Sequence, residues 1–230
     1  MPIQDMEGME HKPIPVIFLI DVSSSMSGLG IQQVNINLAE YIEALKIDPE
    51  TKDAVQLSII TFSDSADTVM KFEPIAGVVS PTLTTQRSTN LASGIAEVMR
   101  VVQEKADFIK AKCKRPLFIF MSDGNATCPE RQRGNEPGWR DEAERMNADF
   151  IMKRAVRVAL GAGNEINDKT LEAFKLNPET DVAIRIGSMK DLSEFFKYIR
   201  TITKELSAGK QPSKPIGADT SETVVIIGPT

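Results

Sequence analysis

The chain has 230 residues, of which 41% are hydrophobic and 26% are charged, and its formal net charge is −5. This length and composition suit one large α/β domain, and the acidic balance excludes nonspecific binding to nucleic acid or to acidic membranes, which both need a basic face. The single histidine, His11, excludes histidine-based catalytic triads and multi-histidine zinc sites.

Three features bear on localisation. Residues 1–12 form a polar leader with three acidic side chains and no apolar core, unlike a secretory signal. The two cysteines, Cys113 and Cys128, lack paired spacing, which argues against a disulfide-built secreted domain. No apolar run approaches the roughly 20 residues that span a bilayer. Together these features predict a cytoplasmic protein that does not bind membranes.

Apolar runs of strand length alternate with helical patterns along the chain. A run such as "PVIFLID" at 15–21 is typical of a strand buried on both faces, and apolar residues every three to four positions indicate amphipathic helices. In chain order, the patterns predict a strand over 15–21, a helix over 31–45, strands over 54–63 and 66–74, a helix over 91–112, a strand over 115–124, a helix over 139–150, a strand over 155–163, a short helix over 168–176, a strand over 181–187 and a helix over 192–206.

This alternation predicts an α/β fold with a doubly wound, mostly parallel central sheet, helices on both faces and one antiparallel edge strand. We expect the domain to cover residues 13–208. The tail at 209–230 is expected to be flexible, with a short apolar segment, "VVIIGP". That segment fits an edge strand, a contact with a partner, or a frayed end.

Oxygen-bearing side chains gather at three predicted strand–helix junctions. The segment "LIDVSSSMSG" offers Asp21, Ser23 and Ser25, "RSTNLASGI" offers Thr89, and "FMSDGNATC" offers Asp123. Each segment alone also fits a turn or a helix cap. Ligands of doubly wound sheets bind beyond the carboxyl ends of the strands, so the fold brings the three segments to one rim. Five hard oxygen donors suit magnesium, manganese or calcium rather than zinc, and favour cation-bridged binding of a carboxylate.

The pattern Asp-x-Ser-x-Ser, followed by a Thr before a helix and by Ser-Asp-Gly after the fourth strand, resembles the metal-ion-dependent adhesion site of von Willebrand factor A domains. The resemblance covers about residues 13–207 and implies their Rossmann-like fold. It also implies that Asp21, Ser23, Ser25, Thr89 and Asp123 form the metal shell, with the hydroxyls as direct or near-direct ligands. Mg²⁺ is the expected ion, with Mn²⁺ and Ca²⁺ as alternatives. The expected function is binding to an acidic residue of a protein partner, not catalysis.

The sequence departs from the family pattern at two positions. Many members have glycine where this chain has Ser24 and Ser88. Neither residue is expected to supply a ligand, and Ser24 is expected to point away from the metal. These departures raise the question of whether the two loops have the same conformation as in the family.

Two longer phrases, "PVIFLIDVSSSM" and "DPETKDAVQLSIITFSDSA", resemble the bacterial TerY-like proteins associated with tellurium resistance. This finer resemblance implies a cytoplasmic bacterial protein in a stress-response system. A protein kinase and a PP2C-type phosphatase are the partners that it implies.

A competing function is that of a magnesium-dependent phosphotransfer enzyme or phospho-acceptor. Such a site needs a cation that stabilises charge and a positioned acid or base, and the three loops supply no Lys, with Arg87 as the nearest candidate.

The P-loop-like "GNEINDKT" carries Asp168 where glycine is required, so we interpret Asn167 or Asp168 as a helix cap. Trp139, in the charged insertion at 128–145, fits either a partner contact or a core anchor.

Overall fold

The computed structural model describes residues 12–163, 165–215 and 225–227. Its sheet has seven strands in the order β3-β2-β1-β4-β5-β6-β7, and every neighbouring pair is parallel except the antiparallel β2 and β3. This arrangement confirms the predicted fold class. The strands are β1 (Ile14–Asp21), β2 (Val55–Phe62), β3 (Ala66–Pro74), β4 (Leu117–Ser122), β5 (Val156–Ala162), β6 (Val182–Ile186) and β7 (Val225–Ile227).

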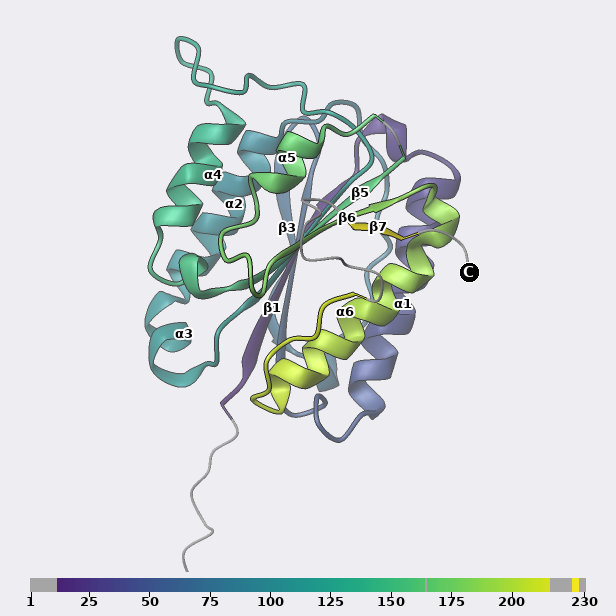
Figure 1. The fold of residues 1–230 in the computed structure, drawn as a ribbon, viewed down its shortest axis with the longest axis vertical. Coiled ribbons are helices and arrows are strands. Elements are labelled where there is room, and N and C mark those ends of the chain that lie inside the picture. Colours follow the sequence, from purple (N-terminus) through teal and green to yellow (C-terminus); the bar gives the residue numbers. More distant parts are fainter. Residues whose placement is uncertain (1–11, 164, 216–224, 228–230) are drawn as a thin grey trace, which may run out of the picture.

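Helices cover both faces of the sheet (Figure 1). One face carries α1 and α6, and the other carries α2, α3, α4 and α5. The helices are α1 (Leu29–Ile47), α2 (Leu91–Glu104), α3 (Ala106–Lys112), α4 (Trp139–Ala148), α5 (Asp168–Glu172) and α6 (Leu192–Ser207), and the 3-10 turns are η1 (Ser24–Met26), η2 (Ile75–Gly77), η3 (Met152–Arg154) and η4 (Met189–Asp191).

The central strand β1 shows why an apolar run forms the middle of such a sheet. All of its residues are buried, and successive side chains alternate between the two faces. Phe18 packs in the cluster under α1 and α6, and Leu19 packs in the cluster under α2 and α4. Because the run is apolar up to its last residue, the first polar side chain, Asp21, lies at the carboxyl edge of the sheet.

Gly94 holds α2 close to the sheet. A Cβ atom at this position would lie 2.9 Å from the Cβ of Phe62 and 3.0 Å from a methyl group of Leu19. No side chain other than hydrogen fits there without displacing a neighbour. This close packing fixes the start of α2, and with it Thr89, against β1 and β2.

Three helices end earlier than the sequence pattern predicts. The helix expected over 91–112 breaks at Lys105, where backbone angles of φ −111° and ψ 11° separate α2 from α3. The helix expected over 139–150 ends at Ala148, because the Asp149 carboxylate caps the next turn by accepting hydrogen bonds from Ile151 and Met152. The α5 helix ends at Glu172.

The final apolar segment contributes an edge strand. β7 pairs in parallel with β6 through Ile184 and Val225, Arg185 and Ile226, and Ile186 and Ile227. Most of the polar leader and residues 216–224 of the tail lie outside the described residues, so the domain boundaries stay a prediction. None of the helices in the described part of the chain has the length and hydrophobicity that crossing a bilayer requires.

Candidate metal centre

Asp21 is the anchor of the candidate site. It is the last residue of β1, is fully buried, and pairs in register with Phe62 of β2. Its Oδ1 accepts a hydrogen bond from the backbone N–H of Ser23 at 2.8 Å, and its Oδ2 accepts one from Ser122 Oγ at 2.6 Å. The carboxylate is therefore held by the loop that follows it and by the end of the neighbouring strand β4.

Ser23, Ser25 and Asp123 extend this anchor toward the surface. The Oγ atoms of Ser23 and Ser25 lie 3.0 Å apart, and Ser25 Oγ donates to Asp123 Oδ1 at 2.6 Å. Ser23 is buried and Ser25 is exposed. The structure thus brings four of the five predicted residues together as a hydrogen-bonded group at the carboxyl edge of β1 and β4.

Thr89 joins this group through the backbone of its loop. Its N–H donates to Thr127 Oγ1 at 3.1 Å, and the N–H of Thr127 donates to the Thr89 carbonyl at 2.9 Å, which ties the loop to the segment after Asp123. Thr89 is only 7% exposed, yet its hydroxyl has no hydrogen-bond partner among the residues that the structure describes. This oxygen is not one of the fully enclosed side-chain atoms that lack a partner, so it reaches solvent and is available for a ligand.

Ser24 points away from the group, toward the loop that carries Thr89. Its Oγ donates to the Arg87 carbonyl at 3.0 Å, and Gln86 N–H donates to the Val22 carbonyl at 2.7 Å. Phe72 is the only non-glycine among the described residues with a positive φ, so the backbone at Ser24 and Ser88 is one that any residue adopts. Serine in place of glycine therefore does not distort either loop.

The two aspartates have no counter-charge among the residues that the structure describes. No Lys or Arg in the described part of the chain forms an ion pair with Asp21 or Asp123. Burial raises the pKa of Asp21 to about 6, even though hydrogen bonds from Ser122 and Ser23 oppose the shift. Burial also raises the pKa of Asp123, with a smaller contribution from the charge of Glu165. Perturbed carboxylates of this kind mark candidate functional sites.

This donor set fits a hard divalent cation. Among the described residues, no three His, Cys, Asp or Glu side chains gather in a way that could hold a metal. The oxygens next to the two carboxylates are hydroxyl groups, those of Ser23 and Ser25. Hard oxygen donors of this kind suit Mg²⁺, Mn²⁺ and Ca²⁺.

A groove of about 560 Å³ opens beside the site. Its lining includes Ser25 and Asp123 together with Glu165 and Met189 from the loops after β5 and β6. Sequence reasoning missed Glu165, because a single acid in a loop without a pattern gives no signal. It also missed Ser122, whose hydroxyl positions Asp21. The signal for Ser122 was present, because it directly precedes Asp123 at the end of a buried strand.

The lesser candidates take structural roles. Trp139 is 7% exposed and packs in the cluster with α2, so it is a core anchor. Asn167 caps α5 by accepting a hydrogen bond from the Lys169 N–H, and Asp168 forms an ion pair with Arg185. Burial raises the pKa of the Cys128 thiol, which disfavours the reactive thiolate.

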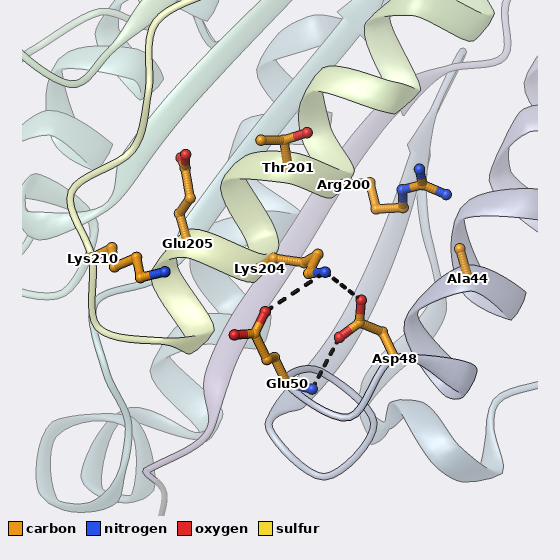
Figure 2. Close-up of a pocket in the computed structure, with 8 residues that line it drawn as sticks. All are labelled: Ala44, Asp48, Glu50, Arg200, Thr201, Lys204, Glu205 and Lys210. Atoms are coloured by element: carbon orange, nitrogen blue, oxygen red, sulfur yellow. Dashed lines mark hydrogen bonds and ion pairs between the residues drawn. The ribbon is translucent and has the colours of Figure 1, made fainter.

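A second hollow lies at the opposite end of the sheet, between the C-terminal ends of α1 and α6 (Figure 2). Its volume is about 500 Å³, and charged side chains line it. Lys204 pairs with Asp48 at 2.7 Å and with Glu50 at 3.6 Å, so it links α6 to the turn after α1. Lys210 also lines the hollow, but its side chain forms no ion pair in the described parts of the chain.

We expect Lys204→Gln to lower stability at pH 7, and we expect this effect to shrink as the pH falls below the ordinary Asp pKa of about 3.9. The hydrogen bond from Lys204 lowers the pKa of Asp48. A lowered carboxyl pKa stabilises the fold above the unfolded pKa, and this contribution is lost as the pH falls through the folded pKa. Urea unfolding of both proteins across this range measures the difference, with Lys210→Gln as the matched control. A difference that does not shrink as the pH falls below about 3.9 would contradict the expectation.

Comparison with known proteins identifies relatives of the fold. The family model described as "von Willebrand factor type A domain" matches residues 16–198. Inter-alpha-trypsin inhibitor heavy chain H3 of Mesocricetus auratus is 24% identical over 179 residues, which are 74% of this chain and 19% of that protein. A C-type lectin domain-containing protein of Caenorhabditis elegans is 34% identical over 58 residues, which are 25% of this chain and 9% of that protein. The chain therefore spans less than a fifth of these curated relatives.

Solved structures share the fold at low identity. The ArnB paralog VWA2 of Sulfolobus acidocaldarius has a TM-score of 0.57 and 18% identity, over 81% of this chain and 45% of that one. The vWF domain of the pilus tip protein Mfa5 of Porphyromonas gingivalis has a TM-score of 0.62 and 11% identity, over 88% of this chain and 98% of that one.

Proximal thread matrix protein 1 from the mussel byssus was solved with a zinc-occupied metal-ion-dependent adhesion site. Its TM-score is 0.56 and its identity 17%, over 85% of this chain and 46% of that one. One conclusion follows from the sheet order, the oxygen-lined rim and the family match over most of the chain. The chain belongs to the von Willebrand factor type A domain family, a family of metal-dependent protein-interaction modules.

Proposed function

We propose that this domain binds a divalent cation, with Mg²⁺ as the expected ion, and through it an acidic residue of a partner protein. The observation that carries the proposal is the pair of carboxylates of Asp21, which is buried, and Asp123, which is half-buried; among the described residues they have no cationic partner, and they lie next to hydroxyl groups. Ionised groups removed from water are costly unless an opposite charge is near. A bound cation would supply that charge.

Asp21, Ser23, Ser25, Thr89 and Asp123 would hold the ion. Three of the five donors are neutral, so the shell carries no more negative charge than the ion carries positive charge. A hard cation in such a shell attracts one more oxygen ligand, and a partner carboxylate is the strongest protein donor of that type. The groove beside Ser25 and Asp123 offers space for the segment that bears this carboxylate.

We further propose that the protein works in the cytoplasm of a bacterium, in a TerY-like tellurium-resistance or stress-response system. The support is the resemblance of "PVIFLIDVSSSM" and "DPETKDAVQLSIITFSDSA" to that group. A protein kinase and a PP2C-type phosphatase are the partners to test first. Co-purification of the full chain with either protein in the presence of Mg²⁺, and its loss in chelator, would support this assignment.

The metal proposal predicts that Mg²⁺, Mn²⁺ or Ca²⁺ raises the melting temperature of the protein above its value in chelator. An ion present at 100 times its dissociation constant stabilises the native state by about 2.7 kcal/mol. For a domain of this size that corresponds to a shift of roughly 5–10 °C. Differential scanning calorimetry measures the shift, and calorimetric titration with Mn²⁺ measures the affinity directly.

Asp123→Asn is the matched variant for this test. It keeps the size of the side chain and an acceptor for Ser25 Oγ, but it removes one of the two charges. We expect at least a tenfold loss of Mn²⁺ affinity. The absence of any cation-dependent shift in the wild type would rule the proposal out. Turnover of a phosphoester that disappears in this variant would instead favour the phosphotransfer function.

A further inference from the structure

An exposed aromatic ring surrounded by cations lies on the face formed by α3 and η3. Phe150, just after α4, is 51% exposed. The Nζ atoms of Lys110 and Lys153 lie 5.8 and 5.5 Å from the centre of its ring, and the guanidinium carbon of Arg154 lies 5.8 Å from it. Cation–π contacts of this length are attractive, but here three positive groups share a single ring. We call these four residues the basic–aromatic face.

The cations of this face have no acidic partner in the part of the chain that the structure describes. In the described ranges, Lys110, Lys153 and Arg154 take part in no ion pair. The carboxylate adjacent to Phe150 in sequence, that of Asp149, is already engaged by Gln103 and by two backbone N–H groups. Three like charges held together without a counter-charge repel one another, so an anion placed among them is favoured.

The same face continues into a small hollow with more positive charge. Lys114 and Arg115 line it together with Lys110 and Arg154, and the apolar side chains of Ile109 and Ile151 form part of its wall. The side chain of Lys114 donates to the backbone carbonyl of Ser207, and that of Arg115 donates to Gln211. Neither of these acceptors carries charge, so both cations keep their full positive charge.

Several surface cations elsewhere on the chain are paired with acidic side chains. Arg131 pairs with Asp141 and Glu144, Arg140 with Glu130, and Lys71 with Glu104. The chain as a whole carries a net charge of −5. An unpaired cluster of cations is therefore a local property of this face and does not follow from the general composition.

We propose that the basic–aromatic face binds a short acidic segment of a partner protein that also carries an apolar side chain. The carboxylates of that segment would pair with Lys110, Lys153 and Arg154, and its apolar side chain would cover Phe150. In Figure 1, α3 lies at the lower end of the molecule, near the start of β1. Asp21 lies at the other end of β1, so a segment bound here leaves the candidate metal centre free.

A short acidic peptide fits this face better than an extended polyanion does. The cluster is confined to α3, η3 and the segment between α3 and β4. A nucleic acid or an anionic bilayer would extend past it onto a molecule of net negative charge, which repels both. The attraction acts among exposed groups, so we expect it to weaken steeply with added salt.

The test measures fluorescence anisotropy of a labelled peptide, Glu-Glu-Asp-Leu-Glu-Glu, with the full chain at low ionic strength and in chelator. Chelator removes cation-bridged binding at the candidate metal centre, so the outcome does not depend on the proposed function. We expect saturable binding that weakens at least tenfold in Lys110→Glu/Lys153→Glu. Phe150→Ala is expected to weaken it about threefold, because the ring contributes apolar contact rather than charge.

Lys52→Glu/Lys190→Glu is the control, because it changes the net charge equally at two exposed positions outside the face. Thermal melts of all variants check that each is folded. Absence of binding by the wild type, or equal weakening by the control, would overturn the proposal. The wild type is also tested with a single-stranded oligonucleotide and with phosphatidylserine vesicles. If either binds more tightly than the peptide, and Lys110→Glu/Lys153→Glu abolishes that binding, the face belongs to another class of partner and the proposal is overturned.

Discussion

Asp21→Asn is expected to abolish the stabilisation by divalent cations and to leave the cation-free protein at least as stable as the wild type. The carboxylate is fully buried and has no cationic partner in the described part of the chain, so its charge is unfavourable when no metal is bound. Asparagine keeps an oxygen that accepts from Ser23 N–H and a polar atom within reach of Ser122 Oγ. The substitution therefore removes charge and little else.

The measurement is chemical unfolding of both proteins in Mg²⁺ and in chelator. We expect the wild type to gain about 2–3 kcal/mol from saturating Mg²⁺ and the variant to gain nothing. Asp53→Asn makes the same chemical change at an exposed position at the other end of the sheet, and it should retain the full gain. A variant that still gains stability from Mg²⁺ would remove Asp21 from the metal shell.

Asp181→Ala is expected to destabilise the fold by about 3 kcal/mol or more, with no change in cation binding. Asp181 is 2% exposed, and its carboxylate accepts from the backbone N–H groups of Arg157, Leu176 and Asn177. It also lies next to the fully buried Arg157, whose pKa is lowered by burial while Asp181 opposes the shift. Its loss leaves N–H groups without acceptors and a buried cation without its compensating charge.

A double-mutant cycle separates these two causes. Arg157→Met removes the buried charge but leaves the Met152 carbonyl and Asn147 without the donor that now satisfies them. If the uncompensated charge of Arg157 dominates the cost, Asp181→Ala should cost clearly less in the Arg157→Met background than alone. Additive costs would place the effect in the hydrogen bonds of Asp181. Glu179→Gln, an exposed change two residues away, is the control.

The buried strands and the rim of the site were predictable because they depend on local sequence. An apolar run that ends in Asp21 places that residue at a sheet edge, whatever the neighbouring strands are. The same holds for "FIFMSDG" and Asp123. The fold then brings these ends together, because parallel strands end at one edge.

The features that were missed depend on contacts between distant segments. The break at Lys105 was missed because apolar residues continue at helical spacing through Val102, Ala106 and Ile109 across it. The role of Ser122 depends on Asp21, which is 101 positions away. The basic–aromatic face is assembled from α3 and η3, which have no shared pattern in the sequence.

The pairing of β7 with β6 has a consequence for solubility. Without β7, the outer edge of β6 would present unpaired N–H and C=O groups, and such an edge is a template for pairing with other chains. A chain shortened to the predicted domain end at residue 208 keeps every helix that the structure describes but loses this cover. The last strand is only three residues long, but it covers this edge and thus protects the domain from edge-to-edge aggregation.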